Sequence, residues 1–275
     1  KPVAALKRGV TAYISTKDRY FSSLPLAINS IISQSLKPKK LVIYDDGEQK
    51  NLTNEPLYLQ LFKMLEINSI EWEVRFGPKI GQVKNHQSML DTAETEYLWR
   101  LDDDNVANPD VLETLVNYLD TNPKVGAVGG CVIDPNRPII CNPAVASSNL
   151  ADIYLGANAQ WYKYTEHSPK HVEHLYSTFL YRVEAGKHGY NESLSPAGHR
   201  EETMFTYEMI RNGWKLVFLP GVTTWHFRNN SGGIRSFIYQ DYWLRDEQIF
   251  QSKLREWGIT TNNYKFFLNK GGLGD

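Results

Sequence analysis

Cysteine is scarce in this 275-residue chain, which contains only Cys131 and Cys141. The two lie ten residues apart, and neither belongs to a CxxC motif or has the spacing of a metal-ligand pair. The sequence therefore predicts neither a disulfide framework nor a cysteine-based metal site. A reducing compartment is the simplest expectation, and a single disulfide stays open.

Long hydrophobic runs and an excess of charge of one sign are absent as well. No apolar stretch approaches the length of a membrane span, and no signal peptide precedes the first predicted strand. The 30 Lys and Arg residues balance 31 Asp and Glu residues, with no basic run that would indicate nucleic-acid binding. We therefore expect a cytoplasmic protein with no nucleic-acid partner, and peripheral association with a membrane stays open.

What the chain does have is ample hydrophobic sequence, 41% of its residues, arranged in alternating strand and helix patterns. The N-terminal half predicts strands at 10–14, 41–44, 72–76 and directly before residue 102, with helices at 24–32, 55–67 and 83–93 between them. Such alternation predicts an α/β fold with a Rossmann-like, mostly parallel sheet flanked by helices on both faces.

Three consecutive carboxylates, Asp102, Asp103 and Asp104, follow the last of these strands. Asn108 is a candidate cap for the next helix, so the cluster lies where open α/β sheets place their ligands. Close like charges call for a raised pKa, a basic partner or a divalent cation. A solvated turn that caps the helix is the competing interpretation.

The pattern is less regular after a predicted strand at 124–132. Residues 134–175 show no periodicity and are predicted to form a long loop or insertion, which is usually functional at that length. A helix from Glu201 to Asn212, strands at 214–219 and 222–226, and a last amphipathic helix over 235–257 follow. We expect a smaller mixed region beside the parallel part of the sheet.

Seven short motifs in this order resemble the family 2 glycosyltransferases of GT-A fold, over about residues 9 to 228. They are Ile14-Ser15-Thr16-Lys17-Asp18-Arg19, Tyr44-Asp45-Asp46-Gly47, Val83-Lys84-Asn85, Leu101-Asp102-Asp103-Asp104, Gly189-Tyr190-Asn191-Glu192, Glu201-Glu202 and Gly213-Trp214-Lys215. The resemblance implies a donor-binding half at 1–130, an acceptor-side and catalytic half at 131–233, and a C-terminal helical extension at 234–275.

The resemblance implies that the donor is a nucleoside diphosphate sugar, UDP-linked by expectation. Its base and ribose would meet the loop formed by Thr16, Lys17, Asp18 and Arg19, and Asp45 or Asp46 would accept the imide hydrogen of uracil. Lys84 stands where the family usually has Arg, so the charge is kept but the bidentate geometry is lost.

For the diphosphate, the resemblance implies a DXD-type site with Mn or Mg as the divalent cation. Asp104 would bind the ion, Asp102 would contact the ion or its water, and Asp102 or Asp103 would contact the ribose. His226 stands where several GT-A enzymes have a further metal ligand, and a nitrogen ligand favours Mn. Arg228, beside the turn at 231–233, would contact the diphosphate.

The Glu201-Glu202 pair occupies the register of the family's general base, and counting back from Gly213 assigns the base to Glu202. It would take the proton of an acceptor hydroxyl on a saccharide or glycoconjugate, in an inverting transfer such as those of polysaccharide biosynthesis. Helix-dipole stabilisation by the two Glu is the competing interpretation. Candidate acceptor contacts are Trp161, Tyr162 and His199.

Three other functions remain in view. A nucleotidyltransferase would need a glycine-rich phosphate loop, and residues 15–19 contain no Gly. A retaining GT-A transferase would share the carboxylate motif but would not use Glu202 as its base. A catalytically inactive sugar-binding domain is disfavoured because Asp104, Glu202 and His226 are all present.

Overall fold

The computed structural model describes residues 6–135, 168–227, 231–234 and 240–259, and the backbone of short strands at 143–144, 146–147 and 162–163. One nine-stranded sheet organises this part of the chain, in the order β10-β13-β6-β12-β4-β1-β2-β3, with β5 also paired to β13. Its strands are β1 (Lys7–Thr16), β2 (Lys40–Asp45), β3 (Glu71–Phe76), β4 (Thr95–Arg100), β5 (Asn105–Ala107), β6 (Val125–Ile133), β10 (Lys170–Val172), β12 (Phe179–Arg182) and β13 (Lys215–His226).

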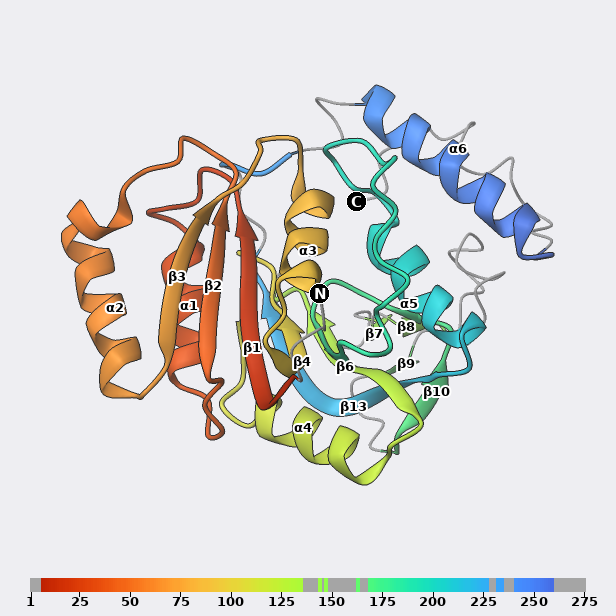
Figure 1. Ribbon diagram of the computed structural model, residues 1–275, viewed down its shortest axis with the longest axis horizontal. Coiled ribbons are helices and arrows are strands. Elements are labelled where there is room, and N and C mark those ends of the chain that lie inside the picture. The colour runs from red at the N-terminus through yellow and green to blue at the C-terminus, as the bar shows by residue number, and fades with distance from the viewer. Residues whose placement is uncertain are drawn as a thin grey trace.

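Helices cover both faces of the sheet, as the alternating pattern predicts (Figure 1). They are α1 (Leu24–Ile32), α2 (Pro56–Ile67), α3 (Gln82–Asp91), α4 (Val111–Thr121), α5 (Glu201–Arg211) and α6 (Gln240–Glu256), with a short 3-10 helix at Leu52–Asn54. The short strands β7 (Pro143–Ala144), β8 (Ala146–Ser147), β9 (Tyr162–Lys163) and β11 (His174–Leu175) form two small two-stranded sheets, β11-β8 and β7-β9.

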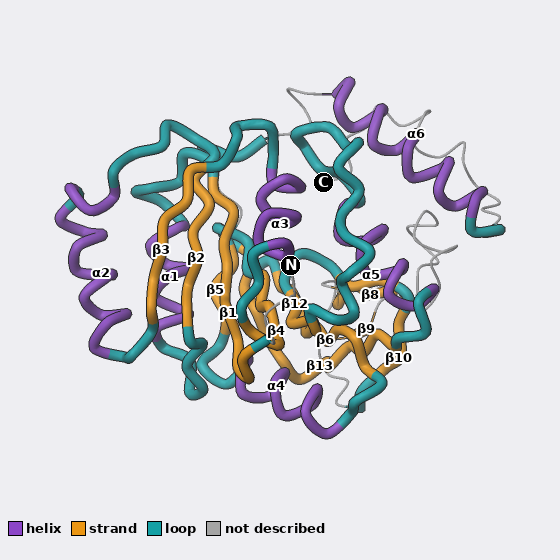
Figure 2. The backbone as a smooth tube through the Cα atoms, in the orientation of Figure 1, coloured by secondary structure: helices purple, strands orange, loops and turns teal. Residues whose placement is uncertain are grey.

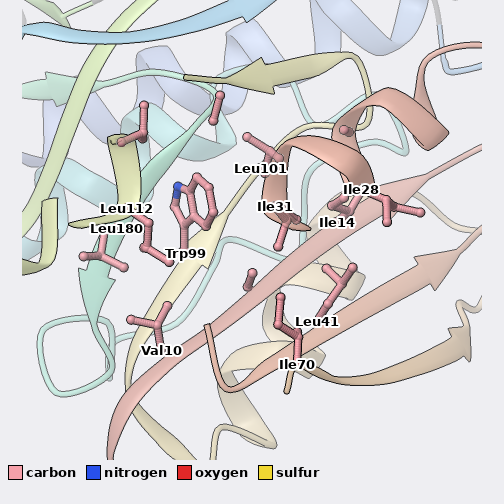
Figure 3. Close-up of a cluster of buried hydrophobic side chains, with 14 of the residues drawn as sticks. Val10, Ile14, Ile28, Ile31, Leu41, Ile70, Trp99, Leu101, Leu112 and Leu180 are labelled. Atoms are coloured by element: carbon pink, nitrogen blue, oxygen red, sulfur yellow. The ribbon is translucent and has the colours of Figure 1, made fainter. Parts of the chain in front are cut away.

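The side-chain alternation of β1 separates two hydrophobic clusters. Val10, Ala12 and Ile14 pack with residues of α1, α2 and α4, whereas Tyr13 packs on the opposite face with residues of α3, α5 and α6. Trp99 of β4 is fully buried in the first cluster (Figure 3). Strands β1, β2 and β4 are therefore buried on both faces, which explains their near-continuous apolar sequences, whereas the edge strand β3 is only partly buried.

Strands β3, β2, β1 and β4 are parallel, and antiparallel pairing begins at β12, which lies between β4 and β6. The tube view shows this mixed part on the opposite side of β1 from β2 and β3 (Figure 2). The ends of β1, β2 and β4 lie at one edge of the sheet, so the polar residues that follow them are neighbours in space. This edge positions the candidate site.

Local differences from the sequence predictions have simple causes. The predicted strands at 214–219 and 222–226 form one strand, β13, with a register shift between Leu219 and Thr223 around Pro220. Helix α4 begins after Asp110 rather than at Asn108, because the Asn108 side chain accepts a hydrogen bond from the Trp225 indole at 3.0 Å. Strand β5, between the three aspartates and Asn108, has only three residues and is too short to produce a recognisable sequence pattern.

Candidate active site

Two adjoining cavities lie at the carboxyl edge of the parallel strands. The first, which we call the aspartate cavity, brings together eight of the residues predicted from sequence: Thr16, Lys17, Arg19, Asp46, Asp102, Asp103, Asp104 and His226. The second, the glutamate cavity, is lined by Glu201, Glu202, His199 and Arg100 among others. Asp102, Gln82 and Tyr176 line both, so the cavities meet there.

Asp103 and Asp104 share one cation, the guanidinium of Arg19. Arg19 Nη1 donates to Asp103 Oδ1 and to Asp104 Oδ2, each at 2.6 Å. Thr16 Oγ1 donates to the other oxygen of Asp103 at 2.7 Å. Arg19, Asp103 and Asp104 are nearly buried, so water screens the repulsion between the two carboxylates only weakly. The Arg19 charge offsets that repulsion.

The two carboxylates differ in their titration. Burial raises the pKa of Asp103 to about 7 against the opposing charge of Arg19, and the neighbouring Asp104 carboxylate raises it further. Burial also acts on Asp104, but the hydrogen bond and charge of His226 and the charge of Arg19 outweigh it and lower the Asp104 pKa. Asp104 is therefore the stronger anion of the pair.

Asp104 also meets His226, which lies at the end of β13. His226 Nε2 is 3.3 Å from Asp104 Oδ2, and the Phe227 amide donates to the Asp104 carbonyl at 2.8 Å. Two neighbouring ligands of an octahedral ion at 2.0–2.1 Å are roughly 3 Å apart. The Asp104 oxygen and the His226 nitrogen are thus spaced as two ligands that could hold such an ion, and in this structure Arg19 supplies the positive charge beside Asp104.

A complete protein-only metal shell is not present in the part of the chain that the structure describes. No group of three or more His, Cys, Asp or Glu side chains is arranged to hold an ion there. A pair of protein ligands leaves room for phosphate oxygens and waters, which is how Mg usually binds with phosphate substrates.

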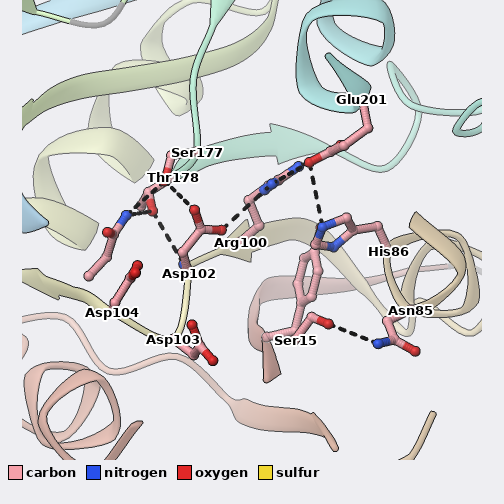
Figure 4. Close-up of polar contacts among 12 residues, drawn as sticks. Ser15, Asn85, His86, Arg100, Asp102, Asp103, Asp104, Ser177, Thr178 and Glu201 are labelled. Carbon is pink, nitrogen blue, oxygen red and sulfur yellow. Dashed lines mark hydrogen bonds and ion pairs between the residues drawn. The ribbon is translucent and has the colours of Figure 1, made fainter. Parts of the chain in front are cut away.

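Asp102 points to different partners from its two neighbours (Figure 4). Its Oδ2 accepts a hydrogen bond from the Ser177 hydroxyl, and its Oδ1 is 3.6 Å from Arg100 Nη2. Successive residues of an extended segment point to opposite sides, and Asp102 lines both cavities whereas Asp103 and Asp104 line only the aspartate cavity. The three carboxylates therefore share one cavity but have two sets of partners, Arg19 for Asp103 and Asp104, and Ser177 with Arg100 for Asp102.

Glu202, in the first turn of α5, is half-buried in the glutamate cavity. Burial and the adjacent Glu201 carboxylate raise the pKa of Glu202 to about 8, partly offset by Arg100. Glu201 is fully buried and accepts two hydrogen bonds from Arg100, at 2.9 and 2.6 Å. Of the predicted acidic pair, Glu202 is the group able to receive a proton from a ligand in the cavity.

Helix α6 completes the glutamate cavity. Its Trp243 stacks on His199 with ring centroids 3.6 Å apart, and His199 Nε2 is 3.0 Å from Glu247. The buried Asp246 carboxylate accepts hydrogen bonds from the amide and hydroxyl of Ser195 and from the His199 amide. The loop that leads into α5 is therefore held by the C-terminal helix.

Of the predicted pair after β2, Asp46 lines the aspartate cavity and Asp45 does not. Asp45 is fully buried, and both of its oxygens accept hydrogen bonds from the Tyr20 hydroxyl, at 2.7 and 2.8 Å. Asp46 accepts from the amides of Lys79 and Gly81 at 2.5 and 3.0 Å. Asp45 thus holds the loop in place, whereas Asp46 faces the cavity.

Replacing Tyr20 by Phe is expected to lower the free energy of unfolding by about 1–3 kcal/mol, because the buried Asp45 carboxylate loses its hydroxyl donor. Urea denaturation measures the change. Tyr118→Phe, on the half-buried face of α4, is the matched control and should change stability by less than about 0.5 kcal/mol. Equal stability of the Tyr20→Phe variant and the wild type would contradict a structural role for the Tyr20–Asp45 pair.

Some predicted residues lie elsewhere. Asp18 is exposed and its Oδ1 accepts a hydrogen bond from the Glu48 amide at 2.7 Å, and Lys84 forms an ion pair with Glu192; neither Asp18 nor Lys84 lines a cavity. Arg228 and Trp161 lie outside the described residues, and of Tyr162 only the backbone in β9 is described.

The structure adds residues that sequence reasoning missed. Gln82 and Tyr176 lie where the cavities meet, and Trp243 forms part of the wall of the glutamate cavity. Arg100 offered the one clear signal, since it is the one charged residue in the run from Tyr97 to Leu101. The other three carry no local pattern that distinguishes them.

None of the helices that the structure describes combines the length and hydrophobicity that a bilayer span requires. A search of curated protein sequences gives no match.

Similar solved structures include two proteins. S. aureus TarS 1–349 in complex with UDP-GlcNAc is 17% identical, with a TM-score of 0.56 over 81% of this chain and 59% of that chain. Its complex with UDP gives 16% identity and a TM-score of 0.55 over 80% and 61%. GalNAc-T7 with UDP, GalNAc and Mn2+ is 16% identical, with a TM-score of 0.62 over 83% and 45%. The chain thus spans about 60% of TarS 1–349, and at such identities the likeness concerns the fold.

The predicted GT-A architecture is confirmed by these neighbours, together with the mostly parallel sheet between two helical layers. The family model for glycosyl transferase family 2 matches residues 11–182, which is more than half of the sequence. The chain therefore belongs to glycosyl transferase family 2.

Proposed function

We propose that this chain transfers a sugar from a UDP-linked donor to a hydroxyl of a saccharide or glycoconjugate, with inversion at the anomeric carbon. The observation that carries the proposal is the pair of adjoining cavities, one lined by Asp102, Asp103, Asp104 and His226 and the other by Glu202. A transfer reaction needs donor and acceptor sites that meet, and these meet at Asp102.

The aspartate cavity suits a nucleoside diphosphate. The Asp46 carboxylate can accept the imide hydrogen of uracil, and Thr16 and Lys17 lie where the ribose would follow. Solved neighbours contain UDP or UDP-GlcNAc, which favours uracil as the base. The sugar would then extend past Asp102 towards Glu202.

A divalent cation would be held by Asp104 and His226, whose donor atoms fit Mg or Mn. When bound, the cation neutralises charge on the departing diphosphate. The neighbour GalNAc-T7 was solved with Mn2+, which supports this choice. Arg19 would give up its contact with Asp104 and retain Asp103 and the incoming phosphates as partners.

The glutamate cavity would hold the acceptor. Trp243 and His199 offer apolar ring surface of the kind that packs against sugar C–H groups, and Glu202 lies at the inner end of α5. Glu202, once deprotonated, would take the hydroxyl proton as the oxygen attacks the face opposite the diphosphate. The raised pKa makes it a stronger base than an exposed carboxylate.

The proposal is tested by measuring thermal unfolding with a panel of nucleoside diphosphates and nucleotide sugars, each with and without Mn. We expect UDP and a UDP-sugar to raise the Tm only when Mn is present, since bound ligand stabilises the folded state. Stabilisation by none of the panel, or equally by all nucleotides without Mn, would contradict the proposed donor site. An inactive sugar-binding domain would respond to saccharides alone.

Replacing Arg19 by Gln should tighten Mn binding in the absence of nucleotide, by roughly 10-fold for about 1.4 kcal/mol of relieved competition. The reason is that the guanidinium and the cation compete for Asp104 Oδ2. Electron paramagnetic resonance of free Mn measures the affinity directly. Arg8→Gln, at an exposed surface pair with Asp120, is the control and should leave it unchanged. Weaker Mn binding by the Arg19 variant would contradict the competition.

A further inference from the structure

Arg100 is a buried cation that lies between the carboxylates of Asp102 and Glu201 (Figure 4). It is the last residue of β4, immediately before the aspartate segment, and its side chain is 2% exposed. Its Nη1 and Nη2 donate to Glu201 Oε2 and Oε1 at 2.9 and 2.6 Å, which is a bidentate pair. A bidentate pair fixes the angle between the two side chains as well as their separation.

The same guanidinium reaches the aspartate segment. Arg100 Nη2 is 3.6 Å from Asp102 Oδ1, so one nitrogen lies between carboxylates that are 99 positions apart in the sequence, on Asp102 and Glu201. The Phe179 ring lies 5.2 Å from the guanidinium, and His86 Nε2 is 3.7 Å from Glu201. Arg100 is thus held by two carboxylates and one aromatic ring.

Stability alone does not account for this pair. Burying two charges costs desolvation energy, and well-packed apolar residues in their place are often at least as stable. What the pair does provide is a fixed link between the end of β4 and the first turn of α5. Glu202 is the next residue after Glu201, so its position relative to the aspartate cavity depends on that link.

We propose that Arg100 is a positioning residue for the transfer reaction: through Glu201 it holds the α5 terminus, and with it Glu202, at a fixed place beside Asp102. The inference rests on the proposed function, because it takes Glu202 as the base. Glu201 and Arg100 carry opposite charges beside Glu202. Replacing them by neutral residues should therefore shift the pKa of Glu202 in opposite directions.

Among the described residues, three charged side chains act on Glu202. Glu201 and Asp102 are anionic neighbours and Arg100 is the cationic one. Among the other residues that line the cavity, His199 and Arg200 are paired with Glu247 of α6, at 3.0 and 3.5 Å. His86 is fully buried, and burial holds its pKa well below the ordinary value, so it stays neutral.

The test is the pH dependence of kcat/KM with a UDP-sugar, whose acidic limb reports deprotonation of the base in the free enzyme. In Glu201→Gln an anionic neighbour is lost, and we expect the limb to move to lower pH by about 1 unit. In Arg100→Met a cationic neighbour is lost, and the limb should move to higher pH by a smaller amount, because Arg100 acts on Glu202 less strongly than Glu201 does. In the double variant the limb should lie between those of the two single variants, while kcat stays reduced.

Arg182→Met is the matched control. Arg182 is a partly buried arginine of β12 in the same sheet, paired with Glu96 at 3.3 Å and remote from both cavities, so its variant should show an unmoved limb. Circular dichroism checks folding, and if Arg100→Met fails to fold, Arg100→Lys and Glu201→Gln carry the test. Arg100→Lys keeps the charge but not the fork, so it should lower kcat with an unmoved limb.

Limbs that stay in place in both single variants, or that move in the same direction, would overturn the positioning role. Donor binding measured by calorimetry separates this failure from a failure of the proposed function. If UDP still binds but the limbs do not move, only the role of Arg100 is contradicted. If the wild-type protein does not bind UDP, the proposed donor site itself is contradicted.

Discussion

Replacing Glu202 by Gln lowers kcat for sugar transfer by about 10²- to 10⁴-fold, the usual contribution of a positioned general base, while the Kd for the UDP donor changes little. Gln has nearly the same shape but cannot take the acceptor proton. Glu202 lies in the glutamate cavity and outside the residues that line the aspartate cavity, so donor binding should survive. Steady-state kinetics and calorimetric titration with UDP measure the two quantities.

The pH profile of the wild type strengthens this test. Burial and Glu201 raise the pKa of Glu202 to about 8, and a base acts in its deprotonated form, so kcat/KM should rise with pH and level off above about 8. Glu208→Gln, on the same helix but paired with Arg211 and the Trp257 indole, is the control and should keep wild-type activity. Full activity of Glu202→Gln would remove this residue from the role of base.

Replacing Asp104 by Asn removes the charge that receives the cation, and the Kd for UDP in the presence of Mn should rise by at least roughly 10- to 100-fold, the loss seen even for groups one step removed from a metal. The Asp104 carboxylate is the more strongly ionised member of its pair and the one that meets His226. Calorimetric titration of UDP with and without Mn measures the effect.

The variant should also abolish the difference between the two titrations, since the remaining weak binding no longer depends on the cation. Asp110→Asn is the control, because this exposed carboxylate precedes α4 without capping it. UDP binding by Asp104→Asn that stays both tight and Mn-dependent would show that the cation is held elsewhere.

The parallel half of the fold could be predicted from sequence because its inner strands are buried on both faces and its helices have a clear apolar stripe. The strand at 41–44, for example, extends by one residue at each end to give β2. The mixed half was harder to predict. β12 pairs antiparallel between β4 and β6, and nothing in its four residues indicates that position.

The candidate site could likewise be predicted in part, where its residues follow the parallel strands. Thr16, Asp46 and Asp104 lie at strand ends, where topology brings side chains together, so short motifs sufficed to predict their proximity. Sequence could not distinguish Asp45 from Asp46, because one residue of register decides which carboxylate faces the core. Trp243 and Gln82 reach the cavities from helices distant in sequence, and only tertiary packing places them there.

The division of labour between the three aspartates is also a property of tertiary structure. Arg19 holds Asp103 and Asp104, whereas Ser177 and Arg100 hold Asp102. The sequence shows only that the three carboxylates are adjacent. Their separate partners come from the loop after β1, from the end of β4 and from the segment before β12.

The most direct test of the account is proton NMR of the sugar released when the protein is incubated with Mn and UDP-α-linked hexoses, with water or a saccharide as the acceptor. The anomeric signal is read before mutarotation. Inverting transfer with Glu202 as the base predicts that the donor is consumed and that the first product is the β-anomer. An α-anomer as the first product, or no consumption of any UDP-hexose, would contradict the account.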